Sequence, residues 1–343
     1  MTELHDLASL ASTFTAVASP FRTYLAELQE KYQALMTGVV ADHINELALA
    51  DPRWFGICVV TTEGQTFEVG DCDKLFTIQS IAKAFVFGLA LEDHGREYVN
   101  SKVSVEPSGE SCHAIVLDET TNRPYNPIIS AGAIAISDLI QGKNATQRLK
   151  RILDMFKRYT GRDHDINVPV FLSEKAMGDR NRAMAYLMRN FGMVSGNIEE
   201  TLDLYFQQCS ILVNSKDLAM LAATLANGGV NPVTGDRALE ERYVQDVISV
   251  MLTCGMYDAS GNWVYRVGLP AQSGLSGGIT AVVPGKLGIG TFSPPLDPKG
   301  NSERGIKVCE DLSQDFGLHL FNVAKPERVL EEWIGGAEGI DDW

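Results

Sequence analysis

Four short segments rich in apolar and β-branched residues predict a sheet, two near each end of the chain. They are residues 54–61, 66–69, 278–283 and 287–292. Glu63-Gly64 separates the first two segments and Pro284-Gly285 the last two. Runs of this kind joined by a turn signal are typical of β-hairpins. We therefore predict an antiparallel sheet that both ends of the chain build together.

Between these hairpins the apolar residues recur every three or four positions, which is typical of helices. The predicted helices are residues 146–159, 179–190, 198–209, 216–227 and 240–252. Asn197 and Glu200 have the spacing of a capping box, Ser215 is placed as an N-cap, and Gly228 as a C-terminal stop.

Together the two patterns predict a mixed α/β (α+β) fold, in which an antiparallel sheet is flanked by helices and a helical domain is inserted. The expected division assigns residues 1–112 and 256–343 to the sheet-containing domain and 113–255 to the helical domain. At 343 residues the chain is long enough for two domains. Residues 335–343 are expected to be loosely held.

Charge and composition exclude several classes of function. The formal charge of −15 would repel phosphate backbones and anionic lipid surfaces, so a nucleic-acid partner is not expected. No apolar run approaches the roughly 18 residues that cross a bilayer. The first ten residues carry acidic side chains and no basic region, unlike a signal peptide. We expect a cytoplasmic protein without a membrane partner.

The cysteines and histidines show no spacing that predicts a metal site or a disulfide framework. We expect buried free thiols at Cys58, Cys72, Cys112, Cys209, Cys254 and Cys309.

The segment TIQSIAKAFVFGLALEDHG, residues 77–95, holds the clearest candidate chemistry. Ser80 and Lys83 are three residues apart, so a helix would place both side chains on one face. Burial among apolar neighbours and a nearby helix N-terminus both favour a neutral lysine, which can take a proton from a serine. The alternative is a surface helix with an N-cap serine and a solvated lysine, because Ser-x-x-Lys arises by chance about once in a chain of this size.

Two other segments supply what a nucleophilic serine needs. The small, glycine-rich stretch 271–279 has backbone N–H groups that can approach a substrate closely, as an oxyanion hole requires. Tyr257 can relay protons. Each feature alone is also compatible with an ordinary turn or a core tyrosine.

Several motifs together resemble the serine-dependent glutaminases, whose fold is similar to that of β-lactamases and penicillin-binding proteins. The resemblance covers residues 40–320. In the order of the family, the motifs are EPSG at 106–109, NP at 126–127, AGAI at 131–134, GDRN at 178–181, LANGG at 225–229, CGMYD at 254–258 and SPPLD at 293–297.

The resemblance implies hydrolysis of a side-chain amide through an acyl-serine. It implies that Ser80 attacks, that Lys83 and Tyr257 share the acid and base work, and that the N–H groups of Ser80 and Leu275 hold the oxyanion. It further implies no metal or organic cofactor, a small-molecule amide substrate, and assembly as a homodimer or homotetramer.

The same resemblance assigns residues to the substrate's α-amino-acid end. Glu174 would face the α-ammonium, Tyr205 would line the pocket, and Asn181 would help to hold the α-carboxylate. A carboxylate can hold an ammonium by a charge-assisted hydrogen bond, and an amide can donate to a carboxylate without adding charge. The alternative for residues 173–181 is a capped helix N-terminus.

The chain departs from the family's pattern mainly where the substrate is recognised. Ser130 replaces an asparagine and His43 a tyrosine, both at positions that contact the α-carboxylate in the family. Cys112-His113 replace FN, Gln272 replaces a lysine, and Leu275 stands where valine is usual, which matters little because only its backbone acts.

These departures lead us to expect the first of three functions, and the other two are its alternatives. The first is hydrolysis of a glutamine-like amide whose α-carboxylate end is esterified, amidated, missing or replaced, because two altered contacts would each cost about 1.5–3 kcal/mol toward a carboxylate. The second is ordinary glutamine hydrolysis, in which Ser130 and His43 still bind the carboxylate, Ser130 through a water. The third is a non-catalytic ligand-binding homologue, if Gln272 has removed an essential cation.

Overall fold

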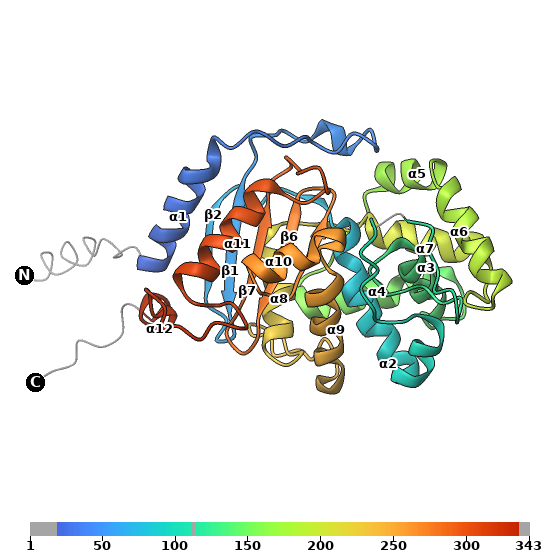
Figure 1. Ribbon diagram of the computed structural model, residues 1–343. Coiled ribbons are helices and arrows are strands. Elements are labelled where there is room, and N and C mark those ends of the chain that lie inside the picture. Colours follow the sequence, from blue (N-terminus) through green and yellow to red (C-terminus); the bar gives the residue numbers. More distant parts are fainter. Residues whose placement is uncertain (1–18, 112–113, 336–343) are drawn as a thin grey trace, which may run out of the picture.

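The computed structural model describes residues 19–111 and 114–335. One part is a five-stranded sheet covered by helices, and a second, helical part lies beside it (Figure 1). The strands of the sheet are β1 (Gly56–Thr61), β2 (Thr66–Gly70), β5 (Ala271–Gly274), β6 (Gly278–Val283) and β7 (Leu287–Phe292).

All neighbouring strands of this sheet are antiparallel, in the order β2-β1-β7-β6-β5. The β1–β2 and β6–β7 pairs are the two predicted hairpins. At the centre, Ile289 of β7 lies opposite Val59 on one side and Ala281 on the other. The predicted sheet, built from both ends of the chain, is confirmed.

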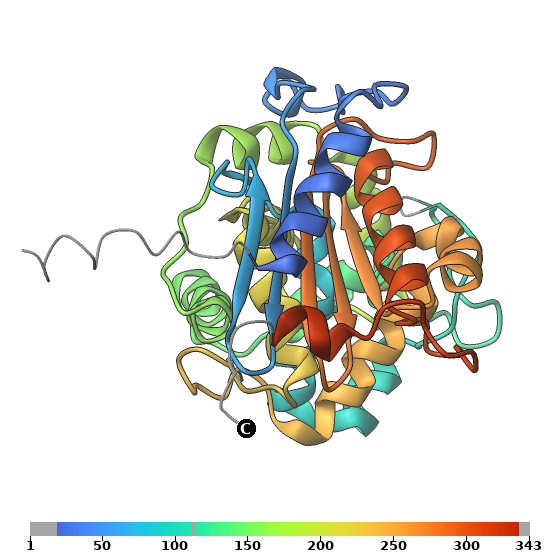
Figure 2. The ribbon, with the colours of Figure 1, turned by 90° about the vertical axis from the view of Figure 1, so that its left-hand side faces the viewer.

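Helices cover both faces of the sheet. From β1, Ile57 and Val59 enter the core shared with α1 (Pro20–Gln33) and α11 (Glu303–Asp315), whereas Cys58 and Val60 pack against α8 (Ser215–Ala226). This alternation follows from the period of two along a strand. Figure 2 shows α1 and α11 side by side across one face, and the short helix α12 (Leu330–Ile334) below them.

Two glycines of β7 allow α8 to approach the other face. A Cβ atom at Gly288 would lie 2.1 Å from the Ala223 nitrogen, and one at Gly290 would lie 2.2 Å from the Ser215 oxygen. Because both obstacles are helix backbone, only glycine fits at these two positions.

The remaining elements are mostly helical. The other helices are α2 (Ala82–Lys102), α3 (Ser130–Leu139), α4 (Ala145–Thr160), α5 (Val168–Ala176), α6 (Asp179–Asn190), α7 (Ile198–Cys209), α9 (Glu241–Cys254) and α10 (Ser260–Arg266). Single 3₁₀ turns are η2 (Leu47–Leu49), η3 (Gln79–Ile81) and η4 (Tyr257–Ala259), and a two-stranded sheet pairs β3 (Phe76–Thr77) with β4 (Leu212–Val213).

The five predicted helices are present, and α6 and α7 have the predicted bounds. One predicted cap is wrong, and one predicted capping box is only partly formed. Asn214, not Ser215, caps α8, because Asn214 and Asp217 form a capping box and Ser215 donates to the carbonyl of Cys72. Asn197 does cap α7, but it accepts from the N–H of Glu199, and the carboxylate of Glu200 accepts from its side-chain amide instead of its backbone.

Gly228, predicted as a stop, follows the end of α8 with φ of +64°. The proposed division into residues 1–112, 113–255 and 256–343 stays a prediction; α8, from the middle range, packs on the sheet. Nearly all of the tail 335–343 lies outside the described residues.

Three general findings concern the residues that the structure describes. Their helices are all too short or too polar to cross a bilayer. They include no cluster of three or more His, Cys, Asp or Glu side chains able to hold a metal. Their five cysteines are free and buried, as predicted, whereas Cys112 is outside the described ranges.

Candidate active site

Ser80 lies in the turn η3 between strand β3 and helix α2, and only 8% of its surface is exposed. The preceding residue, Gln79, has a left-handed φ of +52°. This conformation is uncommon for a residue with a Cβ and persists only where surrounding contacts hold it. The chain therefore turns sharply from strand to helix at the candidate nucleophile.

Lys83 is the second residue of α2 and is 2% exposed. Its side-chain nitrogen lies 6.0 Å from the ring centroid of Tyr205 and 5.8 Å from that of Tyr257. Its charge also acts on Glu174. The structure thus gathers Tyr205, Tyr257 and Glu174, from three further elements, around Lys83, three residues after Ser80.

Glu174, in the last turn of α5, is the acidic member of this group. Burial raises the pKa of its carboxyl to about 7, while a hydrogen bond from Gln79 and the charge of Lys83 oppose that rise. A carboxyl with this pKa exchanges its proton near neutral pH. Binding a cationic group would shift it toward the charged form.

Tyr257 has a left-handed backbone, with φ of +55°. Its hydroxyl accepts a hydrogen bond from the Gln272 amide nitrogen at 3.1 Å and donates to the Ser273 carbonyl at 3.4 Å. The hydroxyl is therefore held against strand β5.

The glycine-rich segment packs against the chain just before Ser80. The Thr77 and Ser276 hydroxyls are 3.0 Å apart, and a Cβ at Gly274 would lie 2.9 Å from the Ile78 carbonyl oxygen. Leu275 is between these two contacts in the sequence. This packing suits the predicted role of its N–H group in an oxyanion hole, which stays a prediction.

The other predicted recognition residues come from separate elements. Ser130 is fully buried at the first residue of α3, Asn181 is partly buried at the third residue of α6, and His43 is exposed before β1. Their roles stay predictions, and Cys112-His113 are outside the described residues.

Two residues of this region were not predicted from the sequence. Gln79 donates to the hydroxyl of Thr77 at 3.1 Å as well as to Glu174, and so links the nucleophile's turn to α5. Cys209 lies close enough to Lys83 and Glu174 for their charges to act on its thiol. Burial raises the pKa of this thiol to about 12. A polar Gln79 inside the apolar TIQSIA segment was the available signal; Cys209 gave none.

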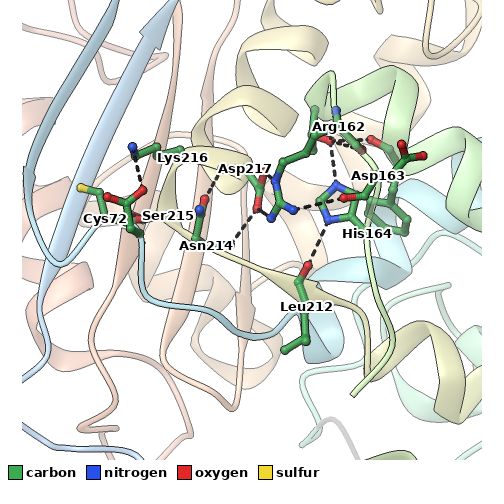
Figure 3. Close-up of polar contacts among 12 residues, drawn as sticks. Cys72, Arg162, Asp163, His164, Leu212, Asn214, Ser215, Lys216 and Asp217 are labelled. Carbon is green, nitrogen blue, oxygen red and sulfur yellow. Dashed lines mark hydrogen bonds and ion pairs between the residues drawn. The ribbon is translucent and has the colours of Figure 1, made fainter. Parts of the chain in front are cut away.

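A network of polar contacts joins the segment after α4 to β4 and to the start of α8 (Figure 3). Arg162 donates to the buried carboxylate of Asp217 at 2.8 Å, and Asp217 is part of the Asn214 capping box of α8. His164 contacts the Leu212 carbonyl through Nδ1 at 3.0 Å. The network fastens the end of α4 to β4 and to the start of α8.

Strand β4 connects this network to the segment that carries Ser80. Leu212 pairs with Thr77 of β3, and the Ile78 N–H donates to the Ile211 carbonyl at 2.8 Å. Only one residue then separates Ile78 from Ser80. The contacts of Figure 3 therefore hold β4, which pairs with β3, the strand just before Ser80.

A cavity of about 210 Å³ adjoins the site and shares Thr77 and Leu275 with it. Most of its wall is apolar and includes Val40, Leu47, Trp54, Phe76, Val170 and Phe292. An apolar cavity with a few polar groups at its edge is typical of small-molecule sites.

Comparisons with known proteins agree with this geometry. The glutaminase family model matches residues 38–321. A glutaminase of Microcystis aeruginosa is 72% identical over 331 residues, covering 96% of this chain and 98% of the relative. One from Trichormus variabilis is 58% identical over 310 residues, covering 90% and 93%.

Solved structures give the same result. The crystal structure of Mglu in its native form has a TM-score of 0.85 at 40% identity, covering 89% of this chain and 75% of that one. A structure named Probable glutaminase ybaS has a TM-score of 0.86 at 38% identity, covering 89% and 99%. The predicted mixed fold, with its β-lactamase-like antiparallel sheet and helices, is confirmed, and the chain belongs to the glutaminase family.

Proposed function

We propose that this protein hydrolyses the side-chain amide of glutamine to glutamate and ammonia through an acyl-serine intermediate. The observation that carries the proposal is the burial of Lys83 one turn after Ser80, beside Glu174 and Tyr257. An amine removed from water favours its neutral form, which can accept the serine's proton.

In the first half of the reaction, the Ser80 hydroxyl oxygen attacks the amide carbonyl carbon and Lys83 takes the hydroxyl proton. The N–H groups of Ser80 and Leu275 stabilise the oxyanion. The nitrogen of the substrate receives a proton from Lys83, by way of Tyr257, and the C–N bond breaks to release ammonia. Water then attacks the ester in the second half, giving glutamate and restoring the serine.

At the other end of the substrate, Glu174 binds the α-ammonium as a charged hydrogen-bond acceptor. Tyr205 lines the pocket, and Asn181, Ser130 and His43 serve the α-carboxylate. The pKa of Glu174, raised to about 7 by burial, falls when the ammonium binds, so binding releases a proton at neutral pH.

The two alternatives differ in what they require. A substrate with an altered α-carboxylate rests on Ser130 and His43, and a non-catalytic role rests on Gln272. The 72% identity to a protein named glutaminase favours glutamine itself. The buried Lys83 beside Glu174 favours catalysis over binding alone.

An ammonia-release assay tests the proposal. The panel is glutamine, asparagine, isoglutamine, and esterified, amidated or decarboxylated glutamine analogues, with Ser80→Ala as the blank. We expect glutamine to have the highest kcat/KM and the blank to be inactive. A higher kcat/KM for an analogue would identify the altered-carboxylate function, and no Ser80-dependent release from any amide would identify a binding protein.

A further inference from the structure

Gln272 is fully buried in β5, and its amide contacts the candidate proton-relay tyrosine. The amide nitrogen is 3.1 Å from the Tyr257 hydroxyl and 3.4 Å from the Ser273 carbonyl oxygen. A carbonyl oxygen can only accept, so the atom facing it is the nitrogen and not the oxygen of the amide. Gln272 therefore donates to the phenol oxygen.

This contact restrains a residue whose backbone is strained. Tyr257 has φ of +55°, and its hydroxyl donates in turn to the Ser273 carbonyl at 3.4 Å. Two neighbouring residues of β5 thus bind the same hydroxyl, one as donor and one as acceptor. Strain of this kind persists where surrounding contacts determine the conformation.

Two basic side chains lie near the tyrosine in the described structure. Lys83 on α2 lies 5.8 Å from its ring centroid, and the adjacent Asp258 pairs with Lys299 at 3.5 Å. A donor that is neutral stabilises the phenolate without placing a second cation beside Lys83. An added cation would repel the charged form of Lys83 and couple the two titrations.

We propose that Gln272 is a positioning residue that fixes the Tyr257 hydroxyl for proton transfer and sets its acidity without adding charge. The proposal rests on the function proposed above. It assigns to Gln272 a role in kcat and in the titration of Tyr257, and none in substrate binding.

A purely structural role would make a different prediction. Thr280 lies opposite Gln272 on β6, is equally buried, and donates one hydrogen bond, to the Leu218 carbonyl at 2.8 Å. Thr280→Val therefore removes a buried donor from the same sheet without touching Tyr257. It is the matched control for Gln272→Met, which keeps the length of the side chain and removes its amide.

The test measures kcat, KM and the titration of Tyr257 in each variant. Chains labelled with 3-fluorotyrosine report the titration by fluorine NMR, and the resonance of residue 257 is the one that Tyr257→Phe removes. Gln272→Lys, which puts a charged donor in the same place, serves as a second variant if the methionine variant does not fold.

We expect Gln272→Met to lower kcat about three- to tenfold, the loss of one neutral hydrogen bond, with KM within twofold of wild type. The Tyr257 midpoint should rise in Gln272→Met and fall in Gln272→Lys, and Thr280→Val should change neither kcat nor the midpoint. Equal effects of Gln272→Met and Thr280→Val, or an unmoved midpoint in both Gln272 variants, would overturn the inference. A wild type that releases no ammonia would refute the proposed function instead, and the NMR titration would still decide the role of Gln272.

Discussion

Lys83 and Arg304 are both long basic side chains withdrawn from water, but their surroundings differ. Lys83 is 2% exposed and lies near a carboxylate and two phenol rings. Arg304 is 0% exposed, lies with its guanidinium 5.3 Å from the Phe55 ring centroid, and donates to the Pro52 carbonyl. In the described part of the chain, no acid forms an ion pair with Arg304.

The comparison shows that burial of a cation does not by itself mark an active site. Around Lys83 the neighbours can exchange protons, since burial places the pKa of Glu174 at about 7. Around Arg304 the neighbours are a ring, a carbonyl and the Met36 sulfur, 3.0 Å away, none of which titrates near neutral pH. Arg304 therefore holds the chain before β1 against α11, whereas the surroundings of Lys83 suit proton transfer.

The largest expected effect is on activity, from Lys83→Met. Without the amine nothing takes the serine's proton, so kcat for glutamine should fall about 10²–10⁴-fold, the usual contribution of a general base. Thermal unfolding should show equal or greater stability, because an apolar side chain replaces a buried polar one. A Lys83→Met variant within tenfold of wild-type kcat would show that Lys83, like Arg304, has no part in catalysis.

Arg304→Ala should have the opposite effects, a loss of stability with little change in kcat. It removes a large buried side chain, so the free energy of unfolding should fall by about 2–4 kcal/mol, as in other large-to-small core changes. The kcat of the folded fraction should stay near the wild-type value. Denaturant unfolding followed by kinetics checks both; a loss of kcat without a loss of stability would place Arg304 among the residues that act on the reaction.

Glu174→Gln tests the neighbour that distinguishes Lys83. The amide cannot hold the substrate ammonium by a charged hydrogen bond, which costs about 1.5–3 kcal/mol, or roughly ten- to a hundredfold. We expect KM for glutamine to rise by that factor and stability at pH 8 to be unchanged or higher. An unchanged KM would assign the ammonium to another residue.

Arg162 offers a third cation, one that is partly exposed and has an acidic partner. Asp217→Asn keeps the size of the buried partner but removes its charge. About 2 kcal/mol of stability should be lost, less than for a fully buried pair, because the Arg162 side chain is 42% exposed. Since the same contacts hold β4 against β3, kcat should fall modestly with KM unchanged. Chemical denaturation together with steady-state kinetics measures both changes.

The last prediction concerns the pH dependence of stability and of kcat/KM that Glu174 causes. The folded-state pKa of Glu174 is about 7, above its ordinary value of 4.5, so the folded protein binds the extra proton between these values. Stability should therefore fall as pH rises from about 4.5 to about 7, by at most about 1.4 kcal/mol for each pH unit, and level off above. Glu174→Gln should lack this slope. In the wild type, kcat/KM should rise over the same window, because only the carboxylate binds the ammonium.

The sequence predicted best the parts of the fold that local patterns specify. Strands β6 and β7 and helices α6 and α7 have the predicted bounds, because turn residues and regular apolar spacing mark their ends. Helix α11 was not predicted, since Arg304 and Gly305 occupy buried positions that the apolar pattern reserves for larger hydrophobic residues. Gly305 is required there by the Thr291 hydroxyl, 2.6 Å from where its Cβ would be.

At the site, residue types were predictable and their backbone settings were not. Ser80, Lys83 and Tyr257 follow from spacing and resemblance. The left-handed φ values of Gln79 and Tyr257 arise from tertiary contacts, and the two-residue pair β3–β4 is too short to leave a periodic pattern. The wrong cap at Ser215 has a similar cause, because two adjacent residues both have capping side chains and only packing selects Asn214.

Covalent trapping tests the reactivity of Ser80 most directly. The glutamine-like electrophile 6-diazo-5-oxo-norleucine, followed by peptide mapping in a mass spectrometer, identifies the nucleophile in the native protein. We predict a single label on Ser80 that forms in the wild type and is lost in Lys83→Met. A label on any other residue, or none while glutamine is still hydrolysed, would contradict the claim that the buried lysine activates this serine.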